Sequence, residues 1–374
     1  MQKIILSLTC LFLIQGCGAG EVEVGRQTRA LGSQCGGTKG VCSCGDTVVQ
    51  SHVLTASDPV TTQDCSSDGL TIGASGIMLD CAGREIRAKP IYPGLGEKEY
   101  TNSWTGITIP DAVNSSTVVG CKITGFHRGV YVGSNSGNTV AWNTFKVGLS
   151  MGGDSNAISI NYNNKAYNSN TKIHFNFFQH LCDWKQYDVV SGTLKTYCYK
   201  SRGLLAQTTK NLSVIGNTWG NIACEDGFTV NPPSDNLEIL FNMFHVTNNY
   251  LQYHPYYHCP TGPGGTGIDF TSWTPAGWPT YGAAHKFTAF EHNVFNLLWR
   301  DNGEENHNLA IRTYNKACVQ PPIPAEYNHY VHLMAVDIPN NKLYTVIEDK
   351  AWVPFMAEVK YLPRLCLFGS PGCS

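Results

Sequence analysis

The chain has 374 residues, of which 42% are hydrophobic and 14% charged, and its formal net charge is −2. This balance provides no basic surface for nucleic acid, so we expect no nucleic-acid partner. The 38 glycines, with few lysines and glutamates, favour short strands joined by tight turns over long helices.

The first residues have the organisation of an export signal. Lys3 precedes an apolar run over residues 4–14, which is too short to span a bilayer. The following Ile14-Gln15-Gly16-Cys17 resembles the lipobox of bacterial lipoproteins, in which the cysteine is lipidated and becomes the new N-terminus. The resemblance implies a signal peptide over residues 1–16 and a membrane anchor at Cys17. Because Gly18, not Asp, follows the cysteine, the resemblance favours the outer membrane. Secretion without an anchor is the alternative.

Residues 17–34 are polar and lack an apolar period, so we expect a flexible tether there. Thirteen cysteines remain beyond Cys10 and Cys17, and so many in an exported chain imply disulfides. Local pairs are favoured, Cys182 with Cys198 and Cys366 with Cys373.

Four more cysteines, Cys35, Cys42, Cys44 and Cys65, cluster near the start of the folded part. A zinc site at Cys42-Ser43-Cys44 is the alternative to disulfides, but its spacing does not suit a zinc knuckle. His254 and His258 are a second metal candidate, although Pro255 argues against a helix that would align them. We therefore expect no metal.

A six-residue pattern recurs five times: apolar, any residue, small or aromatic, Asn, any residue, aromatic. Its copies are Val140–Phe145, Ile173–Phe178, Val214–Trp219, Ile239–Phe244 and, loosely, Ala289–Phe295. Between the copies, a glycine is followed by alternating apolar residues, as in Gly106-Ile107-Thr108-Ile109. Gly106 and Gly129 are 23 residues apart, and Gly203 and Gly227 are 24 apart. A period of this size with two or three short strands per repeat predicts a β-solenoid.

Several segments carry a family resemblance, namely Cys44–Val48, Gly69–Ala74, Gly76–Asp80 and Thr124-Gly125-Phe126. They resemble the opening of right-handed parallel β-helix repeat proteins of the pectate-lyase-like superfamily, over roughly residues 42–312. The resemblance implies an all-β, right-handed parallel β-helix of eight or nine coils, each with three strands, and says little about activity. We place this β-helix at residues 35–312 and a C-terminal cap at residues 313–374.

The recurring asparagines are expected to be structural. Asn143, Asn176, Asn217, Asn242 and Asn293 can adopt left-handed backbone conformations, and their side-chain amides can bond to one another as a ladder between coils. Their uneven spacing, 41 residues from Asn176 to Asn217 and 51 from Asn242 to Asn293, predicts insertions at about residues 179–202 and 245–285. Both insertions leave the same corner, which is typical of the functional side of a repeat protein.

Alternation along the Gly-led strands predicts an outward row on the late coils. The predicted row is Thr108, Tyr131, Ser159, Leu205, Thr229, Asp269 and Ala310, with Arg312 two positions further on. Asp226, in the predicted turn before Gly227, and Asp269 and Arg312 are the candidate catalytic residues. Arg202 and four insertion rings, Tyr256, Tyr257, Trp273 and Trp278, are the candidate substrate-binding residues, since exposed rings suit flat sugar faces.

These residues favour a monomeric envelope lipoprotein that binds polysaccharide on its late coils. A polysaccharide-cleaving enzyme is the alternative, because inverting hydrolysis needs two carboxyl groups about 6.5–9.5 Å apart. We expect no cofactor; Ca²⁺ would be needed only by a lyase. A structural or adhesive surface protein without a small ligand is the third possibility.

Overall fold

The computed structural model describes residues 33–89, 103–146, 155–162, 166–179, 184–188, 193–197, 201–222, 226–247, 266–270, 285–299, 309–313, 319–320 and 329–334. They belong to one compact unit, Gly32–Ser374. This part of the chain is all-β, with two short 3-10 helices, η1 (Gly37–Lys39) and η2 (Pro59–Thr61). No helix within it has the length and apolar character needed to span a bilayer.

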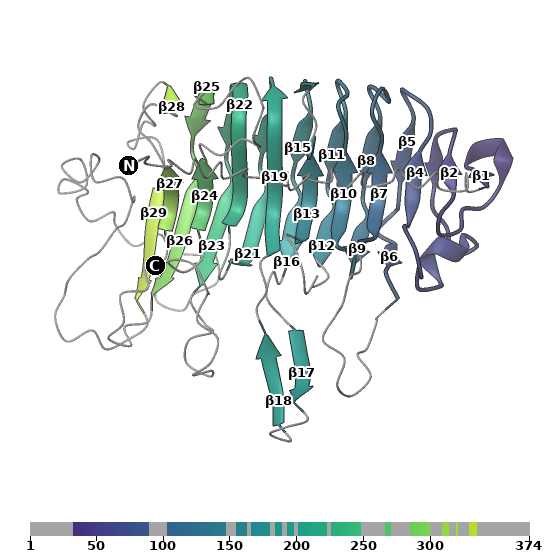
Figure 1. Ribbon diagram of the computed structural model, residues 1–374, viewed down its shortest axis with the longest axis horizontal. Helices are drawn as coiled ribbons and strands as arrows, with labels where there is room; N and C mark the ends of the chain where they lie inside the picture. The colour runs from purple at the N-terminus through teal and green to yellow at the C-terminus, as the bar shows by residue number, and fades with distance from the viewer. Residues whose placement is uncertain are drawn as a thin grey trace, which may run out of the picture. The chain divides into compact units, whose positions relative to one another are not determined.

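The strands form three parallel ladders, each of which gains one strand per repeat of the chain (Figure 1). The first ladder is β1 (Gln34–Cys35), β2 (Thr47–Val48), β4 (Leu70–Ile72), β7 (Thr105–Ile109), β10 (Arg128–Val132), β13 (Ser155–Ile160), β19 (Ser201–Lys210), β22 (Asp226–Leu240), β24 (Thr266–Phe270) and β27 (Leu309–Thr313).

The second ladder carries the first half of the six-residue pattern. It comprises β3 (His52–Val53), β5 (Met78–Asp80), β8 (Thr117–Val119), β11 (Thr139–Ala141), β15 (Lys172–His174), β20 (Ser213–Ile215), the end of β22, β25 (His285–Glu291) and β28 (Val319–Gln320). The short strand β14 (Asn168–Ser169) pairs with the end of β19.

The third ladder carries the second half of the pattern. It comprises β6 (Glu85–Arg87), β9 (Lys122–Thr124), β12 (Thr144–Lys146), β16 (Phe177–Gln179), β21 (Thr218–Ile222), β23 (Met243–Thr247), β26 (Val294–Trp299) and β29 (His329–Met334). The strands β17 (Trp184–Asp188) and β18 (Thr193–Tyr197) form a separate antiparallel pair inside the first predicted insertion.

Parallel pairing at the period of the repeats is the arrangement expected of a parallel β-solenoid. Val130 pairs with Ile107, 23 residues earlier, and Phe228 pairs with Leu204, 24 residues earlier, as the glycine spacing predicts. The prediction of an all-β fold of parallel strands is thus confirmed.

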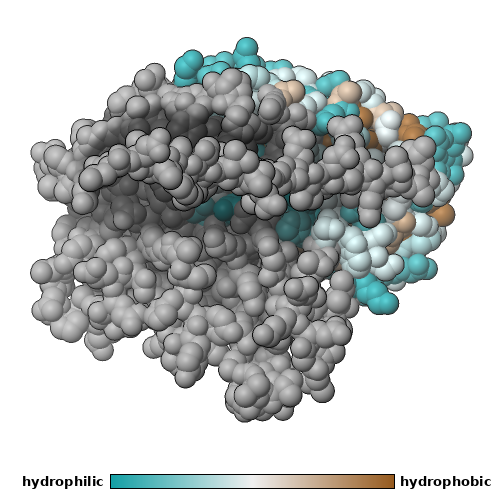
Figure 2. Space-filling model, viewed as in Figure 1, coloured by the Kyte–Doolittle hydropathy of each residue, from teal (hydrophilic) through white to brown (hydrophobic). Residues whose placement is uncertain are grey.

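A column of aromatic rings fills the core beneath the third ladder. The aromatic residue that ends each copy of the pattern is fully buried, and its ring stacks on the next, with centroids 5.3 Å apart for Phe145 and Phe178, 4.7 Å for Phe178 and Trp219, 4.4 Å for Trp219 and Phe244, and 4.9 Å for Phe244 and Phe295. Stacked buried rings contribute more than their buried area alone. On the face drawn in Figure 2, by contrast, the described surface is mostly hydrophilic.

The glycines that lead the first-ladder strands allow close packing against this column. A Cβ added to Gly129 would lie 2.5 Å from the carbonyl oxygen of Ala157 and 2.7 Å from the ring of Phe145. One added to Gly106 would lie 2.6 Å from the carbonyl oxygen of Gly129. The glycines are therefore required where neighbouring backbone and core rings meet, because no side chain fits there.

The predicted asparagine ladder is confirmed. The side-chain nitrogens of Asn143, Asn176, Asn217 and Asn242 each donate to the amide oxygen of the next asparagine at 3.0 Å, so that the ladder runs to Asn293 within the described residues. The same oxygens accept the backbone N–H of the preceding asparagine, as in Asn176 to Asn217 at 2.9 Å. All five side chains are buried, so the ladder satisfies backbone and side-chain groups that water cannot reach.

The backbone explanation offered for these asparagines is wrong. The left-handed residue is the one before each asparagine, at the small-or-aromatic position: Trp142 (φ 57°), Phe175 (55°), Gly216 (67°), Phe241 (55°) and His292 (58°). The turn thus needs the left-handed conformation at the preceding residue. The asparagine is needed because its side-chain amide forms the hydrogen bonds between repeats. A second, exposed ladder does use left-handed asparagines, where Asn211 donates to Asn170 and Asn236 donates to Asn211, both at 2.8 Å.

Three disulfides lie near the start of the folded part: Cys35–Cys42, Cys44–Cys65 and Cys81–Cys121. The first two join the predicted cluster of four cysteines, and they leave neither Cys42 nor Cys44 as a thiolate for zinc. The third is not apparent from sequence proximity, because its cysteines are 40 residues apart. Cys17, Cys182, Cys198, Cys366 and Cys373 lie outside the described residues, so their predicted lipidation and pairing stay predictions.

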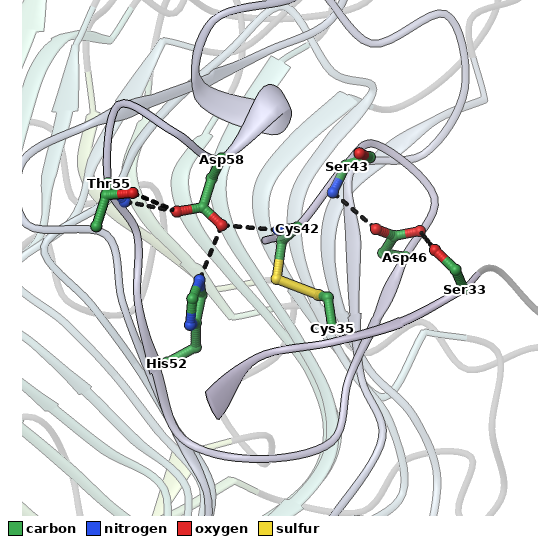
Figure 3. Close-up of a disulfide and its surroundings, with 8 residues drawn as sticks. All are labelled: Ser33, Cys35, Cys42, Ser43, Asp46, His52, Thr55 and Asp58. Carbon is green, nitrogen blue, oxygen red and sulfur yellow. Dashed lines mark hydrogen bonds and ion pairs between the residues drawn. A yellow bond between two sulfur atoms is a disulfide. The ribbon is translucent and has the colours of Figure 1, made fainter. Parts of the chain in front are cut away.

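Asp58 organises the segment around the first disulfide (Figure 3). Its carboxylate accepts the backbone N–H groups of Cys42 and Thr55 at 2.7 Å, the Thr55 hydroxyl at 2.9 Å and the Nε2–H of His52 at 2.8 Å. Burial alone would raise the pKa of Asp58, but these hydrogen bonds together hold the pKa below its usual 3.8.

We predict that the buried asparagine ladder stabilises the fold far more than the exposed one. Asn217→Ala should lower the free energy of unfolding by about 3 kcal/mol, because it leaves the backbone N–H of Asn176 buried without this acceptor and removes one hydrogen bond from the buried carbonyl of Ile173. Asn211→Gly, which keeps the left-handed backbone of the exposed ladder, is the matched control and should cost less than about 1 kcal/mol. Urea unfolding followed by circular dichroism measures both; equal losses would contradict the prediction.

We also predict that Asp58 makes stability pH-dependent on the acid side. A carboxyl group whose folded pKa is lowered stabilises the fold fully above its unfolded pKa of 3.8, and this contribution is lost as the pH falls through the folded value. The melting temperature of Asp58→Asn should therefore lie below that of the wild type at pH 7, and the gap should narrow below pH 4. A gap that is constant from pH 7 to pH 3 would rule out this role.

Candidate functional site

The predicted outward row lies on one strand face of the first ladder. Backbone pairing places Thr108, Tyr131, Ser159, Leu205, Thr229, Asp269 and Arg312 in one line across seven strands. Their neighbours along each strand point to the core, as shown by the full burial of Ile107 and Ile109. The last position was predicted wrongly: Arg312, not Ala310, pairs with Asp269, because Ile311 takes the core position beside Ile268.

The row changes character along its length. Thr108 and Tyr131 are half-buried, whereas Ser159, Leu205, Thr229 and Asp269 are at most 3% exposed. The expectation that Asp269 is solvent-exposed is therefore wrong, since its exposure is 2%. It lies on the face away from the core and yet is covered.

Asp226 and Arg202 extend this covered region. Asp226 is the first residue of β22 and not part of a preceding turn, and it is 2% exposed. Its Oδ2 accepts a hydrogen bond from the Thr229 hydroxyl at 2.8 Å and lies 3.8 Å from Nε of Arg202, whose side chain is 16% exposed. Arg202 thus supplies a positive charge beside a buried carboxylate, as such a carboxylate requires.

Thr229 links the two acids. Its hydroxyl donates to Asp226, and its backbone pairs with Asp269 on the next strand. Neighbouring strands lie about 4.8 Å apart, so side chains of paired residues on one face are close to each other. Asp226 and Asp269 therefore reach one small region from adjacent strands, with Thr229 between them.

A polar cluster upstream, on the early strands, was not predicted. Arg128 lies over the ring of Tyr162, 4.9 Å from its centroid. Tyr131 is in the same region: burial raises its pKa, the negative charge of Asp111 raises it further, and Arg128 opposes both. The sequence placed Tyr131 in this row, but Tyr162 follows the end of β13, where no periodic pattern marks it.

Several predicted site residues cannot be placed. Trp273, Trp278, Tyr256 and Tyr257 lie outside the described residues, as do His254 and His258. For Arg312 the structure gives the backbone position only, opposite Asp269. The acids and Arg202 are therefore the part of the candidate site that the structure brings together.

One side-chain group in the described part of the chain has the composition of a metal site. Ligand atoms of Cys42, His52 and Asp58 lie within 4.8 Å of one another. The sulfur of Cys42 is bonded to Cys35, and the Asp58 oxygens already accept four hydrogen bonds. This cluster is explained by its structural role, since a disulfide sulfur is not the thiolate that binds zinc.

Comparisons with protein-family models, with curated proteins and with solved structures find no match.

Proposed function

We propose that this chain is a right-handed parallel β-helix that binds polysaccharide on its late coils, at the site formed by Arg202, Asp226, Thr229 and Asp269. The observation that carries the proposal is the burial of two acids beside a partly buried arginine on the face of the sheet that points away from the core. We propose β-helix boundaries of residues 35–312 and a C-terminal cap after them.

Burial of these charges has a cost that the fold does not require. On the early strands the same row holds Thr108 and Tyr131, and the ladder continues through them without acids. Buried carboxylates with a charged partner outside the core are typical of functional sites. Carboxylate, hydroxyl and guanidinium groups together can bond to the hydroxyl groups of a sugar in both directions, since some accept and others donate.

Polysaccharide hydrolysis is the second candidate, because Asp226 and Asp269 approach one region from adjacent strands. In such an enzyme one carboxyl group would protonate the leaving oxygen and the other would activate water or attack the sugar.

We propose further that the protein is exported and anchored in the outer membrane through Cys17. The support is the lipobox resemblance together with the oxidised cysteines: all six cysteines in the described part of the chain form disulfides. Disulfides persist in oxidising compartments such as the cell envelope.

We predict that Asp269→Asn weakens polysaccharide binding at least 10-fold. The change keeps the size of the side chain but removes its charge, so hydrogen bonds to sugar hydroxyls lose their charge assistance. Asp235→Asn is the matched control, because Asp235 lies on β22 but pairs with Lys286 at 3.4 Å on another part of the surface. A glycan array identifies the ligand and isothermal titration measures the affinities.

Three outcomes separate the candidate functions. Loss of affinity in Asp269→Asn alone supports the binding site, and release of reducing ends by the wild type but not by this variant shows a hydrolase. Unchanged affinity in Asp269→Asn, or no glycan bound by the wild type, contradicts the proposal and favours a structural surface protein.

A separate prediction concerns the anchor. Cys17→Ser should move the protein from the membrane fraction to the soluble fraction, because the acyl chains can no longer be attached. Cys10→Ser, within the predicted signal, should leave it in the membrane. Intact mass of the mature wild-type chain provides the check: a chain that begins elsewhere, without acyl mass, would refute the anchor.

A further inference from the structure

The left-handed position before each ladder asparagine forms a row along the surface. In order of repeats it holds Gly120, which precedes Cys121 at the equivalent place, and then Trp142, Phe175, Gly216, Phe241 and His292, all with φ between 55° and 67°. Backbone bonds join the row across strands, as in Trp142 N–H to His174 O at 3.1 Å and Phe175 N–H to Ile215 O at 2.9 Å. Glycine adopts this conformation freely, whereas a bulky side chain there costs free energy. Four of the six positions nevertheless carry a ring.

These rings contribute little to the core. Trp142 is 63% exposed, Phe241 60% and Phe175 43%, and His292 is also exposed. A left-handed backbone at a bulky residue costs free energy, and exposing an apolar side chain gains none from burial. Both features therefore make such a residue unfavourable for folding. Such combinations are characteristic of positions kept for binding.

The row is divided into two equivalent units, each a glycine followed by a stacked pair. Trp142 stacks on Phe175 with ring centroids 4.5 Å apart, and Phe241 stacks on His292 at 4.9 Å. Gly120 precedes the first pair and Gly216 the second. Phe175 leans over Gly216, where an added Cβ would lie 2.5 Å from its ring.

In each unit one ring face is open. Trp142 and Phe241 are each stacked on one face by a single ring, and more than half of each residue is nevertheless exposed. The second face of Trp142 lies on the side of Gly120, and that of Phe241 lies on the side of Gly216, over which Phe175 leans. Since the two residues stand three repeats apart, the open faces are separated by about 14 Å, three times the spacing of parallel strands.

Polar side chains flank this row, on the second-ladder strands β15, β20 and β22 that lead into it. Nε2 of His174 lies 2.9 Å from the Ser213 hydroxyl, which lies 2.7 Å from the Glu238 carboxylate. The single hydroxyl proton goes to Glu238, so the imidazole donates from Nε2 and its Nδ1 is an acceptor. Burial and the positive charge of Lys172 lower the pKa of His174, and the negative charge of Glu238 opposes them. The imidazole is therefore neutral at pH 7, and its Nδ1 stays an acceptor.

We propose that Trp142 and Phe241 are two stacking platforms of a second glycan-binding surface, which holds a linear, neutral polysaccharide across the strands. Sugar rings have apolar C–H faces that pack on aromatic faces, and hydroxyl rims that bond to polar groups such as His174, Ser213 and Glu238. Both charge signs are present, in Lys172 and Glu238, so nothing selects a charged sugar. A protein partner would require a broader apolar patch, whereas here polar groups flank a single row of rings.

This surface belongs to the turn between the second and third ladders, and the acid site belongs to the first ladder. The inference therefore stands apart from the proposed function. The two share a ligand class but no residues.

Glycine variants test the platforms without disturbing the fold. Gly120 and Gly216 already occupy the same row, so Trp142→Gly and Phe241→Gly remove a ring and relieve the backbone strain at once. We expect their melting temperatures to lie within a few degrees of the wild type, because lost stacking and relieved strain oppose each other. Tyr167→Ala, which removes another exposed ring (45%) away from the row, is the control.

The binding experiment uses the mature full-length protein and a neutral linear glycan selected on an array. Each glycine variant should raise the dissociation constant at least 10-fold, whereas Tyr167→Ala should leave it unchanged. Oligosaccharides long enough to contact both rings should bind the wild type at least 10-fold more tightly than a disaccharide, and either glycine variant should abolish this gain.

Each result decides one point. Unchanged affinity in both folded glycine variants, or no binding of any neutral glycan by the wild type, overturns the inference. Loss of binding in Asp269→Asn but not in the glycine variants overturns it while the proposed function stands. Loss in the glycine variants but not in Asp269→Asn supports this surface and removes the acid site.

Discussion

The structure depends on buried side-chain amides that bond from one repeat to the next. Each ladder asparagine fixes the backbone of its own turn and of the preceding one, because its amide oxygen accepts both a backbone and a side-chain N–H. A slip by one residue would bury those donors without acceptors. Over the repeats from Asn143 to Asn293, this constraint fixes the register of the second-ladder and third-ladder strands that flank the turn.

The sequence predicted the fold well where a residue type has a single physical use. The asparagines, the buried aromatic after each one and the 23- or 24-residue glycine spacing all correspond to observed contacts. The explanation of two signals was incomplete. Glycines such as Gly129 are required by close packing against Phe145, and the left-handed turn residue is the neighbour of the asparagine.

The candidate site was less predictable, because burial on an outer face depends on what covers it. Alternation alone placed Asp269 in the correct row but indicated a solvent-exposed residue. The register at Arg312 could not be read from the pattern either, since Ala310 takes the position that glycine holds in the other strands. The hydrogen bond from Thr229 to Asp226 joins residues three apart on one strand, a contact that no period signals.

At the left-handed position before the asparagine, the side chain differs between repeats although the fold stays the same. The backbone N–H there donates to a carbonyl of the next repeat, as at Trp142 and Phe175, and the ring side chains are exposed, so glycine, histidine, phenylalanine and tryptophan all occupy it in one chain. Each repeat thus has one position whose residue can change without altering the asparagine ladder, which begins at the next residue. A single codon change can add or remove a recognition group at a fixed place, which makes this edge of the molecule the one most open to evolutionary change in specificity.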